Sequence, residues 1–523
     1  MRTLAITGGR ILEGFDERGE PIWHEGMLVE NGRVVYLGPH PEEMGGPGVR
    51  VLDLDGKVVL PGFADAHIHL LGLGASASML DLRNVESIEE LKRLVAEKAA
   101  ELREGEWILG RGWDHEKFKE GRWPTRWDLD EAAPLNPVLL IRVCGHVAVA
   151  NSLALRLAGI TSSTPDPPSG IIDREGGKLT GLLRESAISL VVSKVPEVPA
   201  QRVLERAFKS LVSAGITSVH AMSVNMRELK ALAELSAEGG IPVRVRAYIT
   251  PEALGEAQLV SESPYFRVVG LKVVLDGSFG ARTAALREPY SDDPGNYGLL
   301  LLDRRRLEEA MRLAERAGLQ LATHAIGDRA LEELLNTVKS SERKVNVRVE
   351  HASLTPPDLL SDMEDLGLGV AAQPRFIVSD WWIVRRLGIE RCRWVYAFKS
   401  ILSRGLILAF SSDAPVEPHS PWEGIYAATT RGRYEGIKLA EISLSEALTV
   451  GEAIYCYTEA PAKLLGEELG RLSVGYPADF VVVDVDPYKT PLSRLKRIRI
   501  LETYVDGVRV WRSASPPRPH TSA

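Results

Sequence analysis

Residues 58–70 read VVLPGFADAHIHL, an apolar run that contains a Pro-Gly pair and ends with two histidines two positions apart. Side chains two positions apart on a strand project from the same face, so we expect His67 and His69 to lie side by side. Imidazole is a common ligand of zinc and similar ions, and such a pair provides half of a metal site. Two ordinary histidines at a strand end would look the same, so the rest of the chain has to decide between these interpretations.

The long middle of the chain alternates apolar strands with amphipathic helices, and we assign residues 61–469 to one domain. The strands that we expect after the first are 215–221, 243–250, 266–277, 319–325, 345–353, 367–374 and 406–415. Alternating elements of this length imply parallel strands joined by crossover helices. Their number favours an α/β fold of the closed (β/α)8 TIM-barrel type, in which ligands gather at the carboxyl ends of the strands. An open doubly wound sheet is the rival, but no GxGxxG follows a strand here.

The two ends of the chain share a different pattern, in which short strands are separated by turn signals. Asn31-Gly32 and Asp506-Gly507 each stand between apolar runs and predict β-hairpins. We therefore expect residues 1–60 and 470–514 to build one small β-sandwich together.

Between residues 71 and 200 the regular alternation is interrupted. This stretch contains four tryptophans and the proline-rich sequence TPDPPSG at 164–170, and it is too long for a βα loop. We expect it to form an inserted subdomain after the first barrel strand. Residues 515–523 are expected to be a disordered tail.

Composition excludes several classes of function. The chain has 523 residues and a formal net charge of −8, which argues against a nucleic-acid binder because phosphate contacts need a concentrated basic face. It contains no run of about 18 apolar residues that would predict a membrane span. Three widely separated cysteines suit a reducing compartment, so we expect a cytoplasmic enzyme. Glutamine is scarce while arginine and glutamate are abundant, a bias typical of thermophilic proteins.

Three more polar residues end apolar runs, and this is what changes the interpretation of the histidine pair. His324 ends LQLATHA, His351 ends VNVRVEHA, and Asp413 ends LILAFSSDA. Any one of them alone would more often be a capping or loop residue than a ligand. In a barrel, however, the strand ends converge on one face, so all of these side chains could meet at one metal site.

Lys272 lies within the expected strand FRVVGLKVVLDG, and a lysine in a buried strand must be paired or neutral. A salt bridge to the nearby Asp276 is one explanation, and the residues alone favour it. The other is that a neutral amine takes up CO₂ and becomes a carbamate, an anionic ligand able to bridge two cations.

Taken together, these residues resemble the binuclear amidohydrolase superfamily. Within it the chain resembles the amidohydrolase-3 (YtcJ-like) group, which includes N-substituted formamide deformylase, and the likeness extends from about residue 3 to 512. The more specific shared motifs are GRGWDHEKFKEGRWPTRWDLDEAAPLNPVLLIRVCGHVAVANSLAL, LKVVLDGSFGARTAAL, THAIGDRA, EHAS, SSDAPVEP and GRLSVGYPADFVVVD. The group's usual aspartate after the histidine of 215–220 is replaced by Ala221, which bears on the pocket rather than on the metals.

The resemblance implies a specific ligand set for two divalent metal ions, expected to be zinc. His67, His69 and Asp413 would bind the more buried ion, and His324 and His351 the second. Lys272, carboxylated, would bridge them.

The activity implied by the resemblance is hydrolysis of a non-peptide C–N bond, amide or cyclic amide, by a hydroxide that bridges the metals. Asp413 would act as the general base and later pass its proton to the leaving amine. A mononuclear deaminase of an aminated heterocycle is the alternative, but such sites usually lack the lysine and carry a glutamate shortly after the histidine equivalent to His324, where this chain has AIGD. A non-catalytic barrel scaffold is a second alternative, and the retention of every ligand argues against it.

Contacts to the small-molecule amide substrate are the least determined part of the prediction. His146, Trp113 and Asp114 in the insertion could reach the pocket, and Arg282 could hold a carboxylate or carbonyl through its forked donors. Each of these could equally stabilise its own surroundings. The aromatic stretch RFIVSDWW at 375–382 would suit an apolar substituent of the substrate or a homodimer contact.

Overall fold

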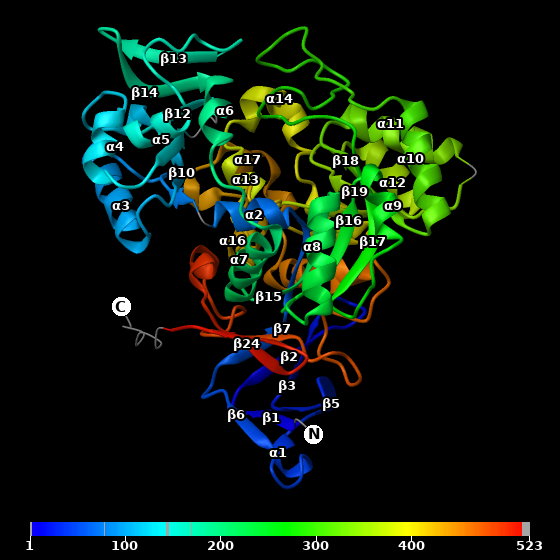
Figure 1. Cartoon of the computed structure of the whole chain (residues 1–523). Helices are drawn as coiled ribbons and strands as arrows, with labels where there is room; N and C mark the ends of the chain where they lie inside the picture. The colour runs from blue at the N-terminus through cyan, green and yellow to red at the C-terminus, as the bar shows by residue number, and fades with distance from the viewer. Residues whose placement is uncertain (1–2, 78, 143–145, 169, 342, 515–523) are drawn as a thin grey trace. The chain divides into compact units, whose positions relative to one another are not determined.

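The computed structural model describes residues 3–77, 79–142, 146–168, 170–341 and 343–514. The chain divides into two compact units, one formed by Met1–Leu73 with Ala207–Ala523 and the other by Gly74–Arg206. Figure 1 follows the chain through both units from its blue amino end to its red carboxyl end. The tail expected at 515–523 lies outside the described residues.

The larger unit is built around a sheet of eight parallel strands that follow one another in chain order. They are β8 (Phe63–Ile68), β15 (Ile216–Val224), β16 (Arg244–Ile249), β17 (Phe266–Val274), β18 (Gln320–Ala325), β19 (Val347–His351), β20 (Gly369–Ala372) and β21 (Leu408–Phe410). The first and last strands are joined just beyond β21, where the Asp413 N–H donates to the His67 carbonyl at 2.8 Å and the His69 N–H to the Ala414 carbonyl at 2.9 Å. The predicted TIM barrel is confirmed.

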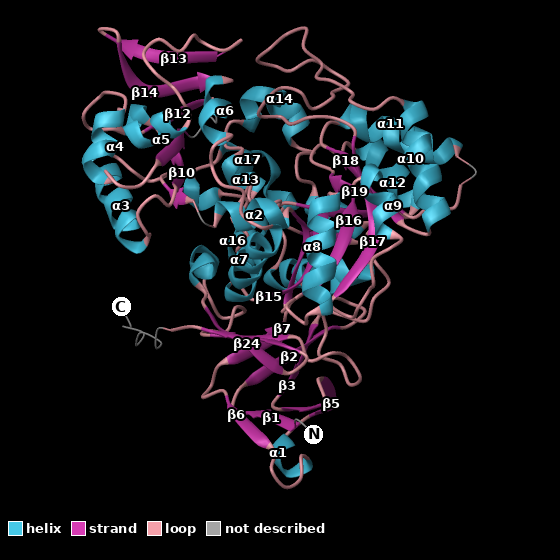
Figure 2. Ribbon diagram, in the orientation of Figure 1, coloured by secondary structure: helices cyan, strands magenta, loops and turns pink. Residues whose placement is uncertain are grey.

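Helices flank these strands, as Figure 2 shows for α8, α10, α11 and α12. The larger unit contains α1 (Pro41–Met44), α8 (Met226–Ala237), α9 (Leu254–Ala257), α10 (Arg304–Ala317), α11 (Asp328–Ser340), α12 (Pro357–Leu366), α13 (Phe376–Ser379), α14 (Ile383–Cys392), α15 (Phe398–Ser403), α16 (Pro421–Thr430), α17 (Lys438–Ser443), α18 (Val450–Tyr457) and α19 (Glu459–Lys463). Helix α10 shows how the sequence sets such an element. The Asp303 side chain caps its first turn, its buried residues recur every three to four positions, and Gly318 ends it with a φ of 66°. In the described part of the chain, no helix is long and apolar enough to cross a membrane.

Both ends of the chain contribute to a two-sheet sandwich. One sheet has the order β5-β4-β1-β6 and the other β24-β23-β22-β7-β2-β3. Their strands are β1 (Thr3–Thr7), β2 (Arg10–Phe15), β3 (Pro21–His24), β4 (Met27–Glu30), β5 (Arg33–Leu37), β6 (Arg50–Asp53), β7 (Val58–Pro61), β22 (Phe480–Val483), β23 (Ile500–Val505) and β24 (Val508–Arg512). Strand β7 joins the two ends because it pairs with β2 on one side and β22 on the other. Asn31 and Asp506 adopt φ values of 48° and 47°, as Asn-Gly and Asp-Gly hairpin turns require.

The smaller unit, Gly74–Arg206, overlaps the stretch 71–200 where we expected an insertion, but it begins three residues later and ends six residues later. It contains a six-stranded sheet of order β13-β14-β12-β11-β10-β9. The strands are β9 (Leu80–Asp81), β10 (Ile108–Trp113), β11 (Val138–Arg142), β12 (Val147–Ala150), β13 (Gly170–Glu175) and β14 (Lys178–Glu185). This unit contains the helices α3 (Ile88–Glu101), α4 (Arg126–Ala132), α5 (Ser152–Leu157) and α6 (Ala187–Val192). The two boundaries of the unit along the chain fall inside α2 (Leu70–Ser76) and α7 (Ala200–Ser213).

Candidate metal centre

The six predicted ligands lie at or just beyond the carboxyl ends of five barrel strands. His67 and His69 come at the end of β8, Lys272 and His324 lie near the ends of β17 and β18, His351 ends β19, and Asp413 follows β21. Because the strands are parallel, these ends share one side of the barrel.

Within this group, histidine rings surround the carboxylate of Asp413. The Nε2 atoms of His67 and His69 lie 3.5 and 3.3 Å from Asp413 Oδ1. Ligand atoms of His67, His351 and Asp413 all lie within 4.8 Å of one another. The rings of His324 and His351 have centroids 4.4 Å apart, so His324 adjoins the same group.

Each of the four histidines has one ring nitrogen bound to an oxygen acceptor of the protein. The pairs are His67 Nδ1 with Glu350 Oε2 at 2.6 Å, His69 Nδ1 with the Met222 carbonyl at 3.2 Å, His324 Nε2 with the Gly277 carbonyl at 3.0 Å, and His351 Nδ1 with Gln373 Oε1 at 2.7 Å. Each acceptor keeps the proton on the nitrogen that it contacts, which leaves the lone pair on the other nitrogen. This is the arrangement that ligand histidines of metal sites adopt. Burial also holds the pKa of His67 and His351 well below the usual histidine range, so both rings are neutral at pH 7.

The backbone at two of the candidate ligands has a strained conformation. His351 has a φ of 73° and Asp413 a φ of 56°, in the left-handed region that residues other than glycine rarely occupy. Such strain persists where the surroundings fix it, and it is concentrated at functional sites. Here the turn at each strand end aims the side chain back toward the other ligands.

Lys272 is buried, with 5% of its surface exposed, and no described residue accepts a hydrogen bond from its Nζ. Asp276, its expected partner, instead accepts backbone N–H groups from Ala285, Ile326 and Gly327 at 2.9–3.0 Å. The salt-bridge interpretation, which the residues alone favoured, is therefore wrong. Burial lowers the pKa of Lys272 to about 8, so that a neutral amine is accessible near physiological pH.

The donor set fits a divalent cation of the zinc type. Neutral imidazoles and a carboxylate are the ligands that such ions prefer. A buried amine without a partner is costly unless another group completes its coordination. These six residues could therefore hold metal, with Lys272 needing a further group before it could act as an anionic ligand.

Comparison with known proteins gives the family. The sequence pattern of the amidohydrolase family matches residues 50–511. The chain is 34% identical to the putative amidohydrolase YtcJ of Bacillus subtilis, over 93% of this chain and 96% of that protein. It is 29% identical to N-substituted formamide deformylase of Arthrobacter pascens, over 92% and 94% of the two chains. The crystal structure of an uncharacterized metal-dependent hydrolase from Pyrococcus horikoshii OT3 is 35% identical, covers 94% of this chain and 99% of its own, and has a TM-score of 0.79.

The chain belongs to the amidohydrolase family. The resemblance inferred from the motifs is thereby confirmed, including the likeness to the YtcJ and deformylase proteins. The Pyrococcus horikoshii relative is, by its name, a metal-dependent hydrolase.

The residues suggested as substrate contacts of this amidohydrolase have identifiable structural roles. Trp113 is fully buried in the core of the smaller unit, and its indole N–H donates to the Leu140 carbonyl at 2.9 Å. Because none of its surface is exposed, Trp113 packs that core. We therefore correct the substrate role suggested for it to a structural one. Asp114 accepts a hydrogen bond from Arg142 at 2.6 Å and caps the turn that follows it.

Two other suggested contacts are also engaged. His146 is exposed, and its Nδ1 lies 3.0 Å from Glu185. Arg282 forms a two-pronged ion pair with Asp292, with distances of 3.1 Å from Nε and 3.0 Å from Nη2. The donor fork that could hold a substrate group thus already binds the Asp292 carboxylate, and any contact of His146 or Arg282 with substrate stays a prediction.

Sequence reasoning missed the residues that hold the histidines. Glu350 and Gln373 are buried and contact His67 and His351 directly. Arg348 is also fully buried and binds Glu350. A signal was present, because Arg348 and Glu350 alternate with apolar residues along β19, and two charges on one face of a strand predicted to be buried require an explanation.

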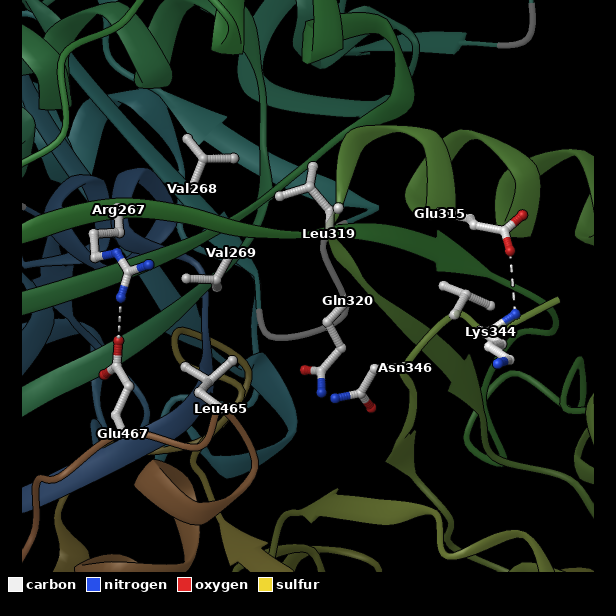
Figure 3. A pocket seen from close by; sticks show the side chains of 12 residues that line it. Arg267, Val268, Val269, Glu315, Leu319, Gln320, Lys344, Asn346, Leu465 and Glu467 are labelled. Carbon is white, nitrogen blue, oxygen red and sulfur yellow. Dashed lines mark hydrogen bonds and ion pairs between the residues drawn. The ribbon is translucent and has the colours of Figure 1, made fainter.

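A cavity of about 380 Å³ lies at the opposite, amino ends of the strands. Figure 3 shows it between the start of β18, marked by Gln320, and side chains such as Arg267, Asn346, Leu465 and Glu467. None of the predicted site residues lines it. Since ligands of TIM barrels bind at the carboxyl ends, this cavity is not the candidate active site.

Proposed function

We propose that this protein is a metal-dependent amidohydrolase that cleaves a non-peptide C–N bond, in an amide or a cyclic amide. The observation that carries the proposal is the set of four histidines, each with one ring nitrogen bound by the protein. His67, His69 and His351 lie near Asp413, and His324 adjoins His351. Because this arrangement leaves a lone pair on the other nitrogen of each ring, it is suited to holding cations.

The candidate ligands divide into two sets, one for each metal ion. His67, His69 and Asp413 would hold one divalent ion, and His324 and His351 a second, with zinc the expected metal. The amine of Lys272, which has no hydrogen-bond partner among the described residues, would attack CO₂ and lose a proton to become a carbamate. This group carries one negative charge over its two oxygens and could help to hold both ions. When bound, the ions would lower the pKa of a water molecule toward neutrality and polarise the substrate carbonyl.

Asp413 is the residue best placed to move the proton. Its Oδ1 lies between the Nε2 atoms of His67 and His69, and 8% of the residue is exposed, so it contacts the site without being open to bulk water. A carboxylate there can accept the proton of the attacking water and return it to the nitrogen of the departing amine. The strained backbone of Asp413 and its hydrogen bond to the His67 carbonyl fix its position.

The choice of bond rests on the relatives. The relative from Arthrobacter pascens, which this chain matches over most of its length, is by its name a deformylase of N-substituted formamides. This supports an amide substrate. The guanine deaminase and triazine hydrolase structures that share the fold are at most 15% identical, so they support the barrel and not the reaction.

Metal content and a substrate screen test the proposal together. We expect about two divalent ions per chain and hydrolysis of at least one member of a panel of N-formyl amines, N-acyl amino acids and cyclic amides. One ion per chain, with ammonia released from an aminated heterocycle, would establish the mononuclear deaminase instead. No metal and no turnover would establish a non-catalytic scaffold.

A further inference from the structure

A buried chain of polar side chains crosses the inside of the barrel and ends at His67. Glu350 Oε2 binds His67 Nδ1 at 2.6 Å, and Glu350 Oε1 accepts from Arg348 Nε at 2.5 Å. Both Glu350 and Arg348 are completely buried. They stand two positions apart on β19, so both side chains project from the same face of that strand, into the barrel.

Arg348 is held by groups from the other side of the barrel. Its Nη2 donates to the Ala66 carbonyl on β8, and its Nη1 lies 2.8 Å from His220 Nδ1 on β15 and 3.0 Å from the Tyr248 hydroxyl on β16. The Tyr248 hydroxyl in turn donates to Gln320 at the start of β18. With donors on both guanidinium ends engaged, Arg348 has one position, and the carboxylate that it binds has one position as well.

Stability alone gives little reason for such a pair. The inside of a TIM barrel is usually filled with branched apolar side chains. A buried ion pair is often no more stabilising than a well-packed apolar pair of the same volume, because both charges lose their hydration. What the pair does that apolar residues could not do is present an oxygen acceptor, with negative charge, to one nitrogen of a candidate metal ligand.

We infer that Glu350, fixed by Arg348, is a positioning residue that keeps the proton of His67 on Nδ1 and directs the Nε2 lone pair toward the metal. The inference rests on the proposed function in that it assumes a divalent ion at His67. It adds that the affinity for that ion depends on a charged pair that does not touch the ion.

Glu350→Gln tests the tautomer directly. A glutamine at this position accepts the Arg348 hydrogen bonds through its oxygen and presents its NH₂ group to His67 Nδ1. His67 must then accept there and carry its proton on Nε2, the nitrogen that faces the metal. We expect the affinity for Co²⁺, measured by competition with a chromophoric chelator, to fall about 10- to 100-fold, and the visible absorption of the Co²⁺ protein to change.

Because Glu350→Gln leaves the Arg348 charge without a counter-ion, a second variant removes both charges. Arg348→Met/Glu350→Leu replaces the pair with apolar side chains, and its metal affinity and Co²⁺ spectrum should change in the same way. The matched control is Arg244→Met/Asp479→Leu, which removes another buried pair, 2.7 Å apart at the amino end of β16. The control should alter the urea midpoint of unfolding but neither the Co²⁺ affinity nor the spectrum.

Wild-type affinity and spectrum in Arg348→Met/Glu350→Leu would overturn the inference, and so would an equal loss of affinity in the control. A wild-type protein that binds no divalent ion would overturn both this inference and the proposed function. A protein that binds metal but cleaves no C–N bond would overturn the proposed function alone, because neither readout here depends on turnover.

Discussion

Replacement of Lys272 by methionine should stabilise the metal-free protein while it abolishes the binuclear site. The lysine is buried, and its Nζ has no hydrogen-bond partner among the described residues. Its pKa falls from an ordinary value of 10.5 to about 8 because of burial. That difference corresponds to a folding cost of about 3 kcal/mol at pH 7. Methionine has similar length and no charge, so Lys272→Met should raise the free energy of unfolding by about that amount.

The pH dependence gives the sign of the effect. In the unfolded chain the lysine stays protonated up to about pH 10.5, whereas in the folded chain it loses its proton above about pH 8. Between these values the unfolded state binds more protons, so the stability of the metal-free wild type rises with pH relative to the variant. Urea unfolding of the wild type and Lys272→Met, both made metal-free with a chelator in CO₂-depleted buffer, should be measured at pH 7 and pH 10. The difference between their free energies of unfolding should shrink to about 1 kcal/mol at pH 10.

An equal difference at both pH values, or a variant less stable than the wild type at pH 7, would refute this account of Lys272. The metal-loaded protein tests the other half of the reasoning. With zinc and ¹³C-bicarbonate, the wild type should show a carbamate carbon resonance and about two ions per chain, and Lys272→Met neither. Two bound ions and full hydrolysis in the variant would refute the carbamate.

Three further predictions concern other parts of the chain. Asp413→Asn should keep the fold but lower kcat by about 10²- to 10⁴-fold, and steady-state kinetics alongside circular dichroism would contradict the proton-transfer role if kcat were unchanged. Gln373→Leu removes the acceptor of His351 and should weaken zinc binding about 10- to 100-fold, as measured by chelator competition; unchanged affinity would exclude a positioning role. Trp113→Ala should destabilise the smaller unit by about 3–5 kcal/mol, seen as faster proteolysis within Gly74–Arg206, while a contact role alone would leave proteolysis unchanged.

The barrel could be predicted because its pattern is local. Apolar runs of strand length that alternate with amphipathic helices imply parallel strands, whichever residues pair. The predicted strands also fixed the positions of their carboxyl ends. His324 and Asp413 could therefore be expected on the same side of the barrel from the sequence alone. Their role as ligands remains a prediction.

What the sequence could not supply was the direction of side chains inside the closed barrel. The choice between a salt bridge and an unpartnered amine at Lys272 depended on where the Asp276 carboxylate points. Asp276 lies four residues further on, yet it turns to backbone N–H groups of two loops. The role of Trp113 stayed open between substrate contact and subdomain core for a related reason. An aromatic residue next to a polar motif suits a binding surface or a core equally well until the sheet around it is known.

The buried charged groups at the amino ends of the barrel strands differ from those at the carboxyl ends in how their charges are compensated. At the amino end of β16, Arg244 binds Asp479 and Asp506, which come from the carboxyl-terminal part of the sandwich. Both partners of this arginine are carboxylates, so its charge is compensated and the contact joins barrel to sandwich. Toward the carboxyl ends, Glu350 is paired with Arg348 and also contacts His67, whereas the Nζ of Lys272 has no hydrogen-bond partner among the described residues. Since an uncompensated buried group is tolerated only where something else completes it, the carboxyl half is the part of the barrel whose stability should depend on added metal.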